Sequence, residues 1–451
     1  GKLEQEDLDI KPELIELHDG ERRKIGPFDC EFLPVTHSTP SGLITAFHTP
    51  QGIILHSSDF KLDLTPVDGR RTNLSRIGAL GDGPGVRLLL CDSTNADQPG
   101  QSTSETSVGA VIAQLVHENA EQRLIFGAFS SHIHRLQQIA DAVVPHGRIV
   151  IPIGRSMLRN FTLARQLGML RIPDANVGTE SDIARSEPHE ICVVCTGSQA
   201  EPRAALTMMA SGDSKYLEFG PTDTVVFSSH PIPGNEAAVS RLRSNIMRTG
   251  AHVVHSGHVD VHTTGHGKQH ELRTLHSVAA PQWFVPVHGE YEHLVAHVEV
   301  AKSLMPENRI VFAQDGEQVV LDDDGVRLTD EQVPAGHVYT DGHIGYLDGS
   351  VIHERRILRD GGFVAVFAVV DIENGTVVSG PSVESRGWVD AQGEHLESEL
   401  ADEAFEAVVA GLDEGITDLD ELERLVRRAV GRTVNGLTGR RPMIVPRLVR
   451  Y

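Results

Sequence analysis

The sequence predicts an α/β protein made of several domains. Short apolar runs bounded by Gly, Pro, Ser or Asp fill the first hundred residues, as expected for strands. From Leu124 onward, such runs alternate with segments of helical periodicity. Repeated strand-then-helix units are typical of a doubly wound α/β layer. The 451 residues allow about three domains of roughly 150 residues each.

The first strands are expected where apolar runs end in polar turns. They are "CEFLPVTH" (30–37), "LITAFHT" (43–49), "GIILHSSD" (52–59) and "VRLLLCDST" (86–94). The alternating part begins with "LIFGAF" (124–129), followed by a helix in "HRLQQIADAVVPHG" (134–147), which Gly147 ends. Further strand-helix pairs are expected from 148, 191 and 224, and a last strand ends at His288.

The last third of the chain has a different pattern. The stretch after residue 315 is rich in Asp and Gly and predicts short strands and turns in a connector. "FVAVFAVVDIENGTVVSG" (363–380) predicts two strands around an Asn-Gly turn. "DLDELERLVRRAV" (418–430) predicts an amphipathic helix, so this part is expected to form a small α+β domain.

Composition excludes some classes of protein and weighs against others. No apolar run approaches the ~18–20 residues of a membrane span, and no basic segment followed by an apolar one suggests secretion. Four cysteines are too few for a disulfide framework and favour a cytoplasmic protein. The formal charge of -23 counts mildly against nucleic-acid binding, because phosphate contacts need positive surface, although a local arginine-lined groove could still bind RNA.

Four expected strands end in a group that can bind metal or phosphate. These groups are His37, Asp59, Asp92 and His288. Neutral imidazole and carboxylate suit a divalent ion such as zinc, which needs three or four ligands from different strands. Each group alone is more often a capping or turn residue, but the shared pattern favours a metal site.

Histidines also cluster beside small hydroxyl residues and glycines, in "SSHIHR" (130–135) and "HSGHVDVHTTGHGKQH" (255–270). Hydroxyl, imidazole and nearby backbone N–H groups donate hydrogen bonds to phosphate. His266, between two glycines, favours function, whereas His270, His276 and His293 fit a solvated surface. Cys192 and Cys195 form a lone C-x-x-C on an apolar strand, which favours two buried thiols.

Eight motifs, in this order, resemble the ribonuclease J family, metallo-β-lactamase-fold nucleases with a β-CASP insertion. They are T-H-S (36–38), S-D-F-K-L-D (58–63), D-S-T-N-A (92–96), S-H-I-H-R (131–135), T-G-S-Q-A-E-P (196–202), P-I-P-G-N-E (231–236), T-T-G-H-G (263–267) and P-V-H-G-E-Y (286–291). The resemblance runs essentially from Gly1 to Tyr451.

The resemblance implies an αββα metallo-β-lactamase sandwich, partial at its N-terminus, with an inserted doubly wound α/β β-CASP domain and a small α+β C-terminal domain. The implied parts are the first metallo-β-lactamase segment (1–98), the β-CASP domain (99–250), the returning segment (251–325), a linker (326–348) and the C-terminal domain (349–451).

The resemblance also assigns roles to individual residues. His37, Asp59 and His288 match metal ligands, with Asp59 bridging two ions, and Asp92 matches the acidic motif that opens the β-CASP region. Catalytic roles fall to Asp59, Asp92 and His266. The residues expected to bind RNA phosphate are Thr264, His266, Ser130, Ser131, His132, Ser228 and Ser229.

The resemblance further implies two divalent ions, zinc or else manganese or magnesium, and RNA with a 5′ monophosphate as the substrate. It implies 5′-to-3′ exonuclease and endonuclease activity in RNA maturation and mRNA decay, in a homodimer or homotetramer without a membrane association. The family's principal metal motif, His-x-His-x-Asp-His, is absent from the sequence. We therefore expect an N-terminally incomplete member with impaired activity; the alternatives are a non-catalytic RNA-binding or assembly protein and a metallohydrolase with a non-nucleic substrate.

Overall fold

The computed structural model describes residues 13–82, 85–232, 234–341, 345–387 and 396–451. The chain forms two compact units, residues 1–334 and 335–451. The described residues are mixed α/β with several sheets, which confirms the predicted fold class.

A six-stranded sheet opens the first unit, in the order β1-β2-β3-β4-β5-β11. Its strands are β1 (Arg22–Ile25), β2 (Phe28–Pro34), β3 (Leu43–Thr49), β4 (Gly52–His56), β5 (Val86–Asp92) and β11 (Trp283–Val287). Helices α2 (Leu74–Asp82), α8 (Gln269–Ala279) and α9 (Tyr291–Lys302) cover one face, where Leu33, Leu55 and Leu275 belong to one core. On the other face, Leu88 and Val285 pack with Val326 of the hairpin formed by β12 (Glu317–Leu321) and β13 (Val326–Gln332).

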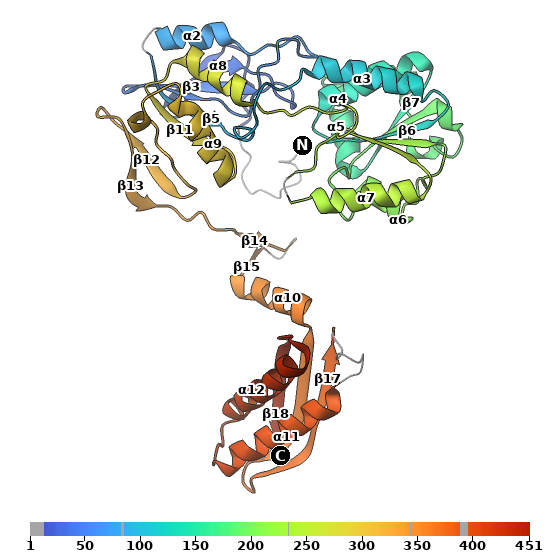
Figure 1. Cartoon of the computed structure of the whole chain (residues 1–451), viewed down its shortest axis with the longest axis vertical. Helices are drawn as coiled ribbons and strands as arrows, with labels where there is room; N and C mark the ends of the chain where they lie inside the picture. The colour runs from blue at the N-terminus through green and yellow to red at the C-terminus, as the bar shows by residue number, and fades with distance from the viewer. Residues whose placement is uncertain (1–12, 83–84, 233, 342–344, 388–395) are drawn as a thin grey trace. The chain divides into compact units, whose positions relative to one another are not determined.

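A second, fully parallel sheet has the order β10-β9-β6-β8-β7. Its strands are β6 (Arg123–Gly127), β7 (Ile149–Ile153), β8 (Ile191–Cys195), β9 (Asp223–Phe227) and β10 (His252–His255). Helices α3 (Glu105–Glu118), α4 (Ile133–Val143) and α5 (Arg155–Gln166) pack on one face, and α6 (Ala205–Ser211) and α7 (Glu236–Arg248) on the other (Figure 1). This is the doubly wound layer that the alternating pattern predicts.

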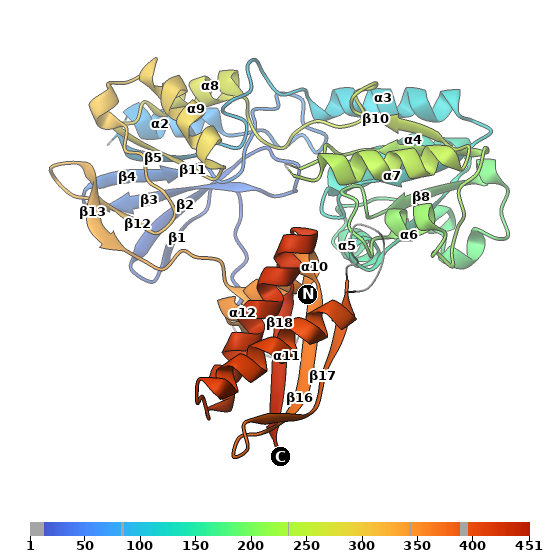
Figure 2. The ribbon, with the colours of Figure 1, turned by 60° about the horizontal axis from the view of Figure 1, so that its bottom comes forward.

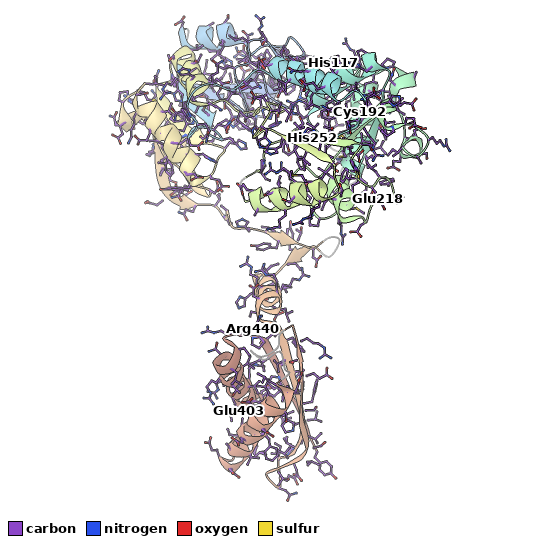
Figure 3. The ribbon with its side chains drawn as sticks, turned by 45° about the vertical axis from the view of Figure 1, so that its right-hand side comes forward. His117, Cys192, Glu218, His252, Glu403 and Arg440 are labelled. Atoms are coloured by element: carbon purple, nitrogen blue, oxygen red, sulfur yellow. The ribbon has the colours of Figure 1, made fainter. Side chains whose placement is uncertain are left out.

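The side chains of one strand show how both faces are filled. In β8 every residue is buried; Cys192 and Val194 belong to the core with α3–α5, whereas Val193 and Cys195 belong to the core with α6 and α7. Figure 3 labels Cys192 within this part of the chain. A parallel strand covered on both sides needs such a continuous apolar run. The two cysteines are free, and burial raises the pKa of Cys192 to about 12, so they are buried thiols as expected.

Strand pairing continues across two of the predicted domain boundaries. β10 pairs with β9, so the second sheet continues to His255, beyond residue 250, where the inserted domain was expected to end. The hairpin of β12 (Glu317–Leu321) and β13 (Val326–Gln332) spans the expected boundary between residues 325 and 326. Two short strands, β14 (Tyr339–Thr340) and β15 (Tyr346–Leu347), lie in the rest of the connector.

The second unit contains a three-stranded sheet in the order β17-β16-β18. β16 (Phe363–Asp371) and β17 (Thr376–Arg386) are antiparallel around the predicted Asn-Gly turn, where Gly375 has a φ of 65°, and β18 (Met443–Arg450) runs parallel to β16. Helices α11 (Glu397–Asp413) and α12 (Leu419–Thr438) pack on one face of this sheet (Figure 2). The helix α10 (Gly349–Gly361) precedes it.

Candidate metal and phosphate site

The topology of the first sheet gathers four of the predicted residues at one edge. β4, β5 and β11 are parallel neighbours, so the loops that carry Asp59, Asp92 and His288 leave the sheet on the same side. β2 runs in the same direction, since it is antiparallel to β3 and β3 is antiparallel to β4, and it leads to His37. Ligands bind where such strand ends meet in α/β sheets.

His37 is held as a neutral imidazole whose Nε2 contacts only the Ser38 hydroxyl, at 3.4 Å, and Asp59, at 3.8 Å. Its Nδ1 lies 2.8 Å from the carbonyl oxygen of Gly265, which makes Nδ1 the donor and leaves the lone pair on Nε2. Burial lowers the pKa of His37, against the smaller effect of this bond. An imidazole oriented through its other nitrogen is the usual form of a metal-binding histidine.

Asp59 lies between two imidazoles. Its Oδ2 is 3.8 Å from Nε2 of His37, and its Oδ1 is 3.4 Å from Nε2 of His288. The carboxylate is 46% exposed, so it can reach a ligand from solvent. Each oxygen therefore faces a different nitrogen donor, which is the arrangement that a bridging carboxylate needs.

His288 adopts a backbone conformation that is uncommon for a residue with a side chain. Its φ is 55°, in the left-handed region. Its carbonyl accepts a hydrogen bond from the backbone N–H of Ser93, at 3.1 Å, which secures the strained residue to the end of β5. Such outliers concentrate at functional sites, where the surrounding structure sustains their cost.

Asp92 and His266 form the shortest polar contact of the site, at 2.6 Å between Oδ2 and Nδ1. Burial works to raise the pKa of Asp92 and to lower that of His266, but their mutual attraction outweighs it, so the pKa of Asp92 is lowered and that of His266 is raised. The pair thus favours an imidazolium beside a carboxylate. Thr94 donates two hydrogen bonds to Oδ1 of Asp92, from its backbone N–H and from its hydroxyl.

Thr264 and His266 are set by an asparagine from the 92–96 motif. Asn95 Nδ2 donates to the hydroxyl of Thr264 and to the carbonyl of His266, both at 2.9 Å. The Thr264 hydroxyl also accepts from the N–H of His266, at 3.1 Å. Because it accepts twice, its own O–H proton remains available to a phosphate oxygen.

Within the described part of the chain, two groups of side chains have the spacing to hold a metal ion. One is His37, Asp59 and His266, and the other is Asp92, His266 and His288; in each, the ligand atoms lie within 4.8 Å of one another. The structure thus brings together all five residues predicted for metal binding and catalysis, and His266 is common to both groups.

The residues predicted to bind the RNA 5′ end differ in their exposure to solvent. Ser131 is exposed and Ser130 is half-buried, with its hydroxyl accepting from Asn160 at 3.1 Å. Ser228, Ser229 and His132 are buried, at 0%, 4% and 2% exposure. Ser228 donates to the carbonyl of Val261 at 2.7 Å and accepts from Arg135, so its hydroxyl is already committed.

Sequence reasoning missed the buried charges behind the site. Arg135, Glu105, Lys61 and Asp63 are at most 5% exposed and contact one another directly or through Glu105. The one available signal was the arginine in S-H-I-H-R, and nothing in a single sequence shows that it is buried.

Together, a mixed α/β unit with a parallel inserted sheet and a histidine-carboxylate edge defines the class of the β-CASP metallo-hydrolases. Family models agree: "Ribonuclease J, beta-CASP domain" matches residues 121–246, "Zn-dependent metallo-hydrolase RNA specificity domain" matches 234–311, and "Ribonuclease J C-terminal domain" matches 350–451.

Curated relatives extend the similarity over nearly the whole chain. Ribonuclease J of Mycobacterium tuberculosis is 38% identical over 98% of this chain and 78% of its own length. Ribonuclease J of Corynebacterium glutamicum is 37% identical over 97% of this chain, which spans only 61% of that relative. Ribonuclease J of Thermus thermophilus is 33% identical over 99% of this chain and 77% of its own. The chain belongs to the ribonuclease J family.

Proposed function

We propose that this chain is a ribonuclease J-like, metal-dependent RNase that recognises RNA with a 5′ monophosphate. Its proposed activity is that of a 5′-to-3′ exoribonuclease with endoribonuclease activity, of the kind that matures RNA and degrades mRNA. The observation that carries the proposal is the Asp59 carboxylate, placed between Nε2 of His37 and Nε2 of His288. The shared family with proteins named ribonuclease J supports RNA as the substrate.

The donor set fits a divalent ion in part. His37, Asp59 and His288 offer neutral imidazole and carboxylate, the ligands that zinc takes in hydrolytic sites, and manganese or magnesium are the alternatives. Three protein ligands suffice for one zinc ion but not for two, and the sequence contains no His-x-His-x-Asp-His motif. We therefore propose that this chain is impaired in turnover while its RNA site persists.

When bound, a divalent ion held by these residues would polarise the phosphodiester and activate water. The chain's own groups have separate tasks. The Thr264 hydroxyl and the His266 imidazolium donate to oxygens of the scissile phosphate, and Asp92 keeps the imidazole protonated and oriented. Either donor stabilises negative charge as it develops on the phosphate.

A second proposal is a non-catalytic RNA-binding or assembly protein, and the incomplete ligand set favours it for this chain. The metal-to-protein ratio of the purified 451-residue chain, measured by elemental mass spectrometry after dialysis, decides between them together with an RNA turnover assay. A ratio near two with turnover supports the nuclease and contradicts the proposed impairment, because further ligands must then complete the site. RNA binding without metal or turnover supports the binding protein. A chain that neither binds nor cleaves RNA contradicts both.

Two further expectations stay proposals. The four cysteines of the chain are all free thiols, which supports a reducing cytoplasm. A homodimer or homotetramer is expected from the family resemblance alone. None of the helices in the described residues is long and apolar enough to cross a membrane.

A further inference from the structure

Behind the proposed RNA site lies a buried charge cluster of Lys61, Asp63, Glu105, His132 and Arg135. Arg135 is 0% exposed, and its Nη2 donates to Oε2 of Glu105 at 2.6 Å. His132 Nε2 lies 3.2 Å from the other carboxylate oxygen, in contact without full hydrogen-bond geometry. Glu105 is thus the acceptor that joins α3 to the start of α4.

The guanidinium of Arg135 also organises two loops that carry candidate site residues. Its Nη1 donates to the hydroxyl of Ser228 and, at 2.5 Å, to the carbonyl oxygen of Val261. Ser228 follows β9 directly, and Val261 begins the segment that leads to Thr264 and His266. One planar group therefore fixes the spacing of the 228–229 and 261–266 loops, which a flexible ammonium could not do.

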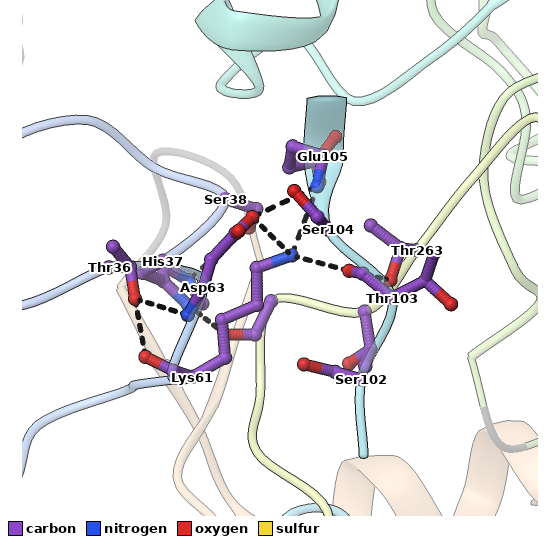
Figure 4. Close-up of polar contacts among 12 residues, drawn as sticks. Thr36, His37, Ser38, Lys61, Asp63, Ser102, Thr103, Ser104, Glu105 and Thr263 are labelled. Carbon is purple, nitrogen blue, oxygen red and sulfur yellow. Dashed lines mark hydrogen bonds and ion pairs between the residues drawn. The ribbon is translucent and has the colours of Figure 1, made fainter. Parts of the chain in front are cut away.

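The same cluster holds the loop that carries Asp59. The backbone N–H of Glu105 donates to Asp63 Oδ2 at 2.9 Å. Figure 4 shows Lys61 at the centre of the remaining contacts, with its Nζ 3.2 Å from the carbonyl of Thr103 and 3.9 Å from Glu105 Oε1. The backbone carbonyl of Lys61 accepts from the hydroxyl of Thr36, the residue before His37.

Neither His132 nor Ser228 offers RNA a donor that is both accessible and free. His132 is 2% exposed, and the hydroxyl of Ser228 is occupied as both donor and acceptor. An RNA 5′ end would reach Ser131 and Ser130 on the surface of the same loop.

We propose that Arg135, held by Glu105, is a positioning residue for 5′-end recognition. It sets the distance between the Ser130–Ser131 loop, the 228–229 loop and the Thr264–His266 pair. His132 and Ser228 act through Arg135 without touching RNA. This inference rests on the proposed function, because it assigns a role in the proposed 5′-end site. Removing the guanidinium would leave the buried Glu105 with only its longer contacts to His132 and Lys61, and it would leave Ser228 and Val261 without the donor that they share, so the loops would shift.

The test measures binding of a short single-stranded RNA, labelled at its 3′ end, with either a 5′ monophosphate or a 5′ hydroxyl, in EDTA to stop turnover. The readout is the ratio of the two dissociation constants, which general destabilisation does not change. Arg135→Gln is expected to lower this ratio about tenfold, toward one. Arg135→Lys keeps a charge beside Glu105 and is the second variant, expected to fold and still lose the preference because it cannot bridge Ser228 and Val261.

Arg148→Gln is the matched control. Arg148 is equally buried in the same sheet region, but it donates to the backbone carbonyls of Asn119, Ala120, Gln122 and Ile191, away from the site. It is expected to lose stability while retaining the preference for the 5′ monophosphate. His132→Gln keeps a donor toward Glu105 and is expected to retain the preference too; if His132 touched phosphate directly, this variant would lose it.

The possible outcomes distinguish a failure of 5′-end recognition from a failure of the role given to Arg135. A native chain that binds both RNAs equally contradicts 5′-end recognition itself, and with it this inference. A native chain with a preference that Arg135→Lys or a folded Arg135→Gln retains overturns the inference alone. Loss of the preference in both Arg135 variants, with retention in Arg148→Gln and His132→Gln, supports it.

Discussion

Two histidines at the same sheet edge differ because of the atom that each ring nitrogen contacts. A neutral carbonyl oxygen, from Gly265, orients His37 and leaves its other nitrogen as a lone pair. A buried carboxylate, Asp92, orients His266 and raises its pKa. The first arrangement suits metal binding, and the second suits hydrogen-bond donation to a phosphate. The hydrogen-bond partner of each imidazole therefore decides which of the two roles it suits.

Asp59→Asn is expected to weaken metal binding at the site, because the amide loses the negative charge that faces His37 and His288. The zinc dissociation constant, measured by chelator competition, should rise at least about tenfold. Asp29→Asn removes a carboxylate that pairs with Arg22 on the surface of the same sheet and should leave zinc binding unchanged. Equal zinc binding by native chain and Asp59→Asn would exclude Asp59 as a ligand.

His276 was expected on a solvated surface, but it is 3% exposed, and its Nε2 lies 3.3 Å from Nε2 of His297. Burial lowers the pKa of His276 from 6.5 to about 4. The unfolded chain therefore takes up this proton at higher pH than the folded chain does. The stability that the neutral form confers is present above pH 6.5 and is lost as pH falls toward 4, by roughly 1 kcal/mol at pH 5.5.

His276→Leu removes this titration, so its unfolding free energy should fall less between pH 7.5 and 5.5 than that of the native chain. Urea unfolding at the two pH values measures the difference. The exposed His270→Ala on the same helix is the control and should keep the native pH dependence. An unchanged pH dependence in His276→Leu would show that His276 is protonated in the fold.

At the scale of elements, the strands and their polar ends could be predicted because an apolar run followed by Asp or His is a local pattern. The helices α4 and α12 were likewise evident from their periodicity. The contacts that form the site are not local in sequence. Asp92 and His266 are 174 residues apart, and β11, which pairs with β5, follows the whole second sheet along the chain. Burial of Arg135 and of Ser228 depends on that packing, so no local pattern in the sequence shows it.

The contact of α11 with α12 depends on one glycine. A Cβ at Gly411 would lie 2.5 Å from Leu422 Cδ2 and 2.9 Å from Leu425 Cδ1, whereas a Cβ at Gly436 of α12 would meet no atom within 4 Å. Gly411→Ala should destabilise the second unit by about 1–3 kcal/mol through overpacking. Gly436→Ala should stabilise it by roughly 0.5–1 kcal/mol, since alanine loses less entropy in a helix.

Calorimetry of the full chain carrying either substitution measures these effects on the transition of the second unit. Opposite shifts are expected. A neutral or stabilising shift in Gly411→Ala would mean that the two helices separate enough to accept a methyl group at Gly411.

At the scale of the whole molecule, the candidate site and the C-terminal sheet lie in different units. His37, Asp59, Asp92, His266 and His288 all lie in residues 1–334, and the core of the second unit is built from its own residues, such as Val366, Val408 and Val426. Each unit therefore has the buried apolar contacts that a separate fold requires.

Limited proteolysis should separate the two units. Residues 331–340 are all exposed, so a protease of broad specificity is expected to cut there first and to leave two resistant fragments, identified by mass spectrometry. Metal retained by the native chain should remain with the larger fragment, because every candidate ligand is in it. Cuts spread through the second unit would show that its core needs the first, and metal lost on cleavage would show that residues beyond 334 support the site.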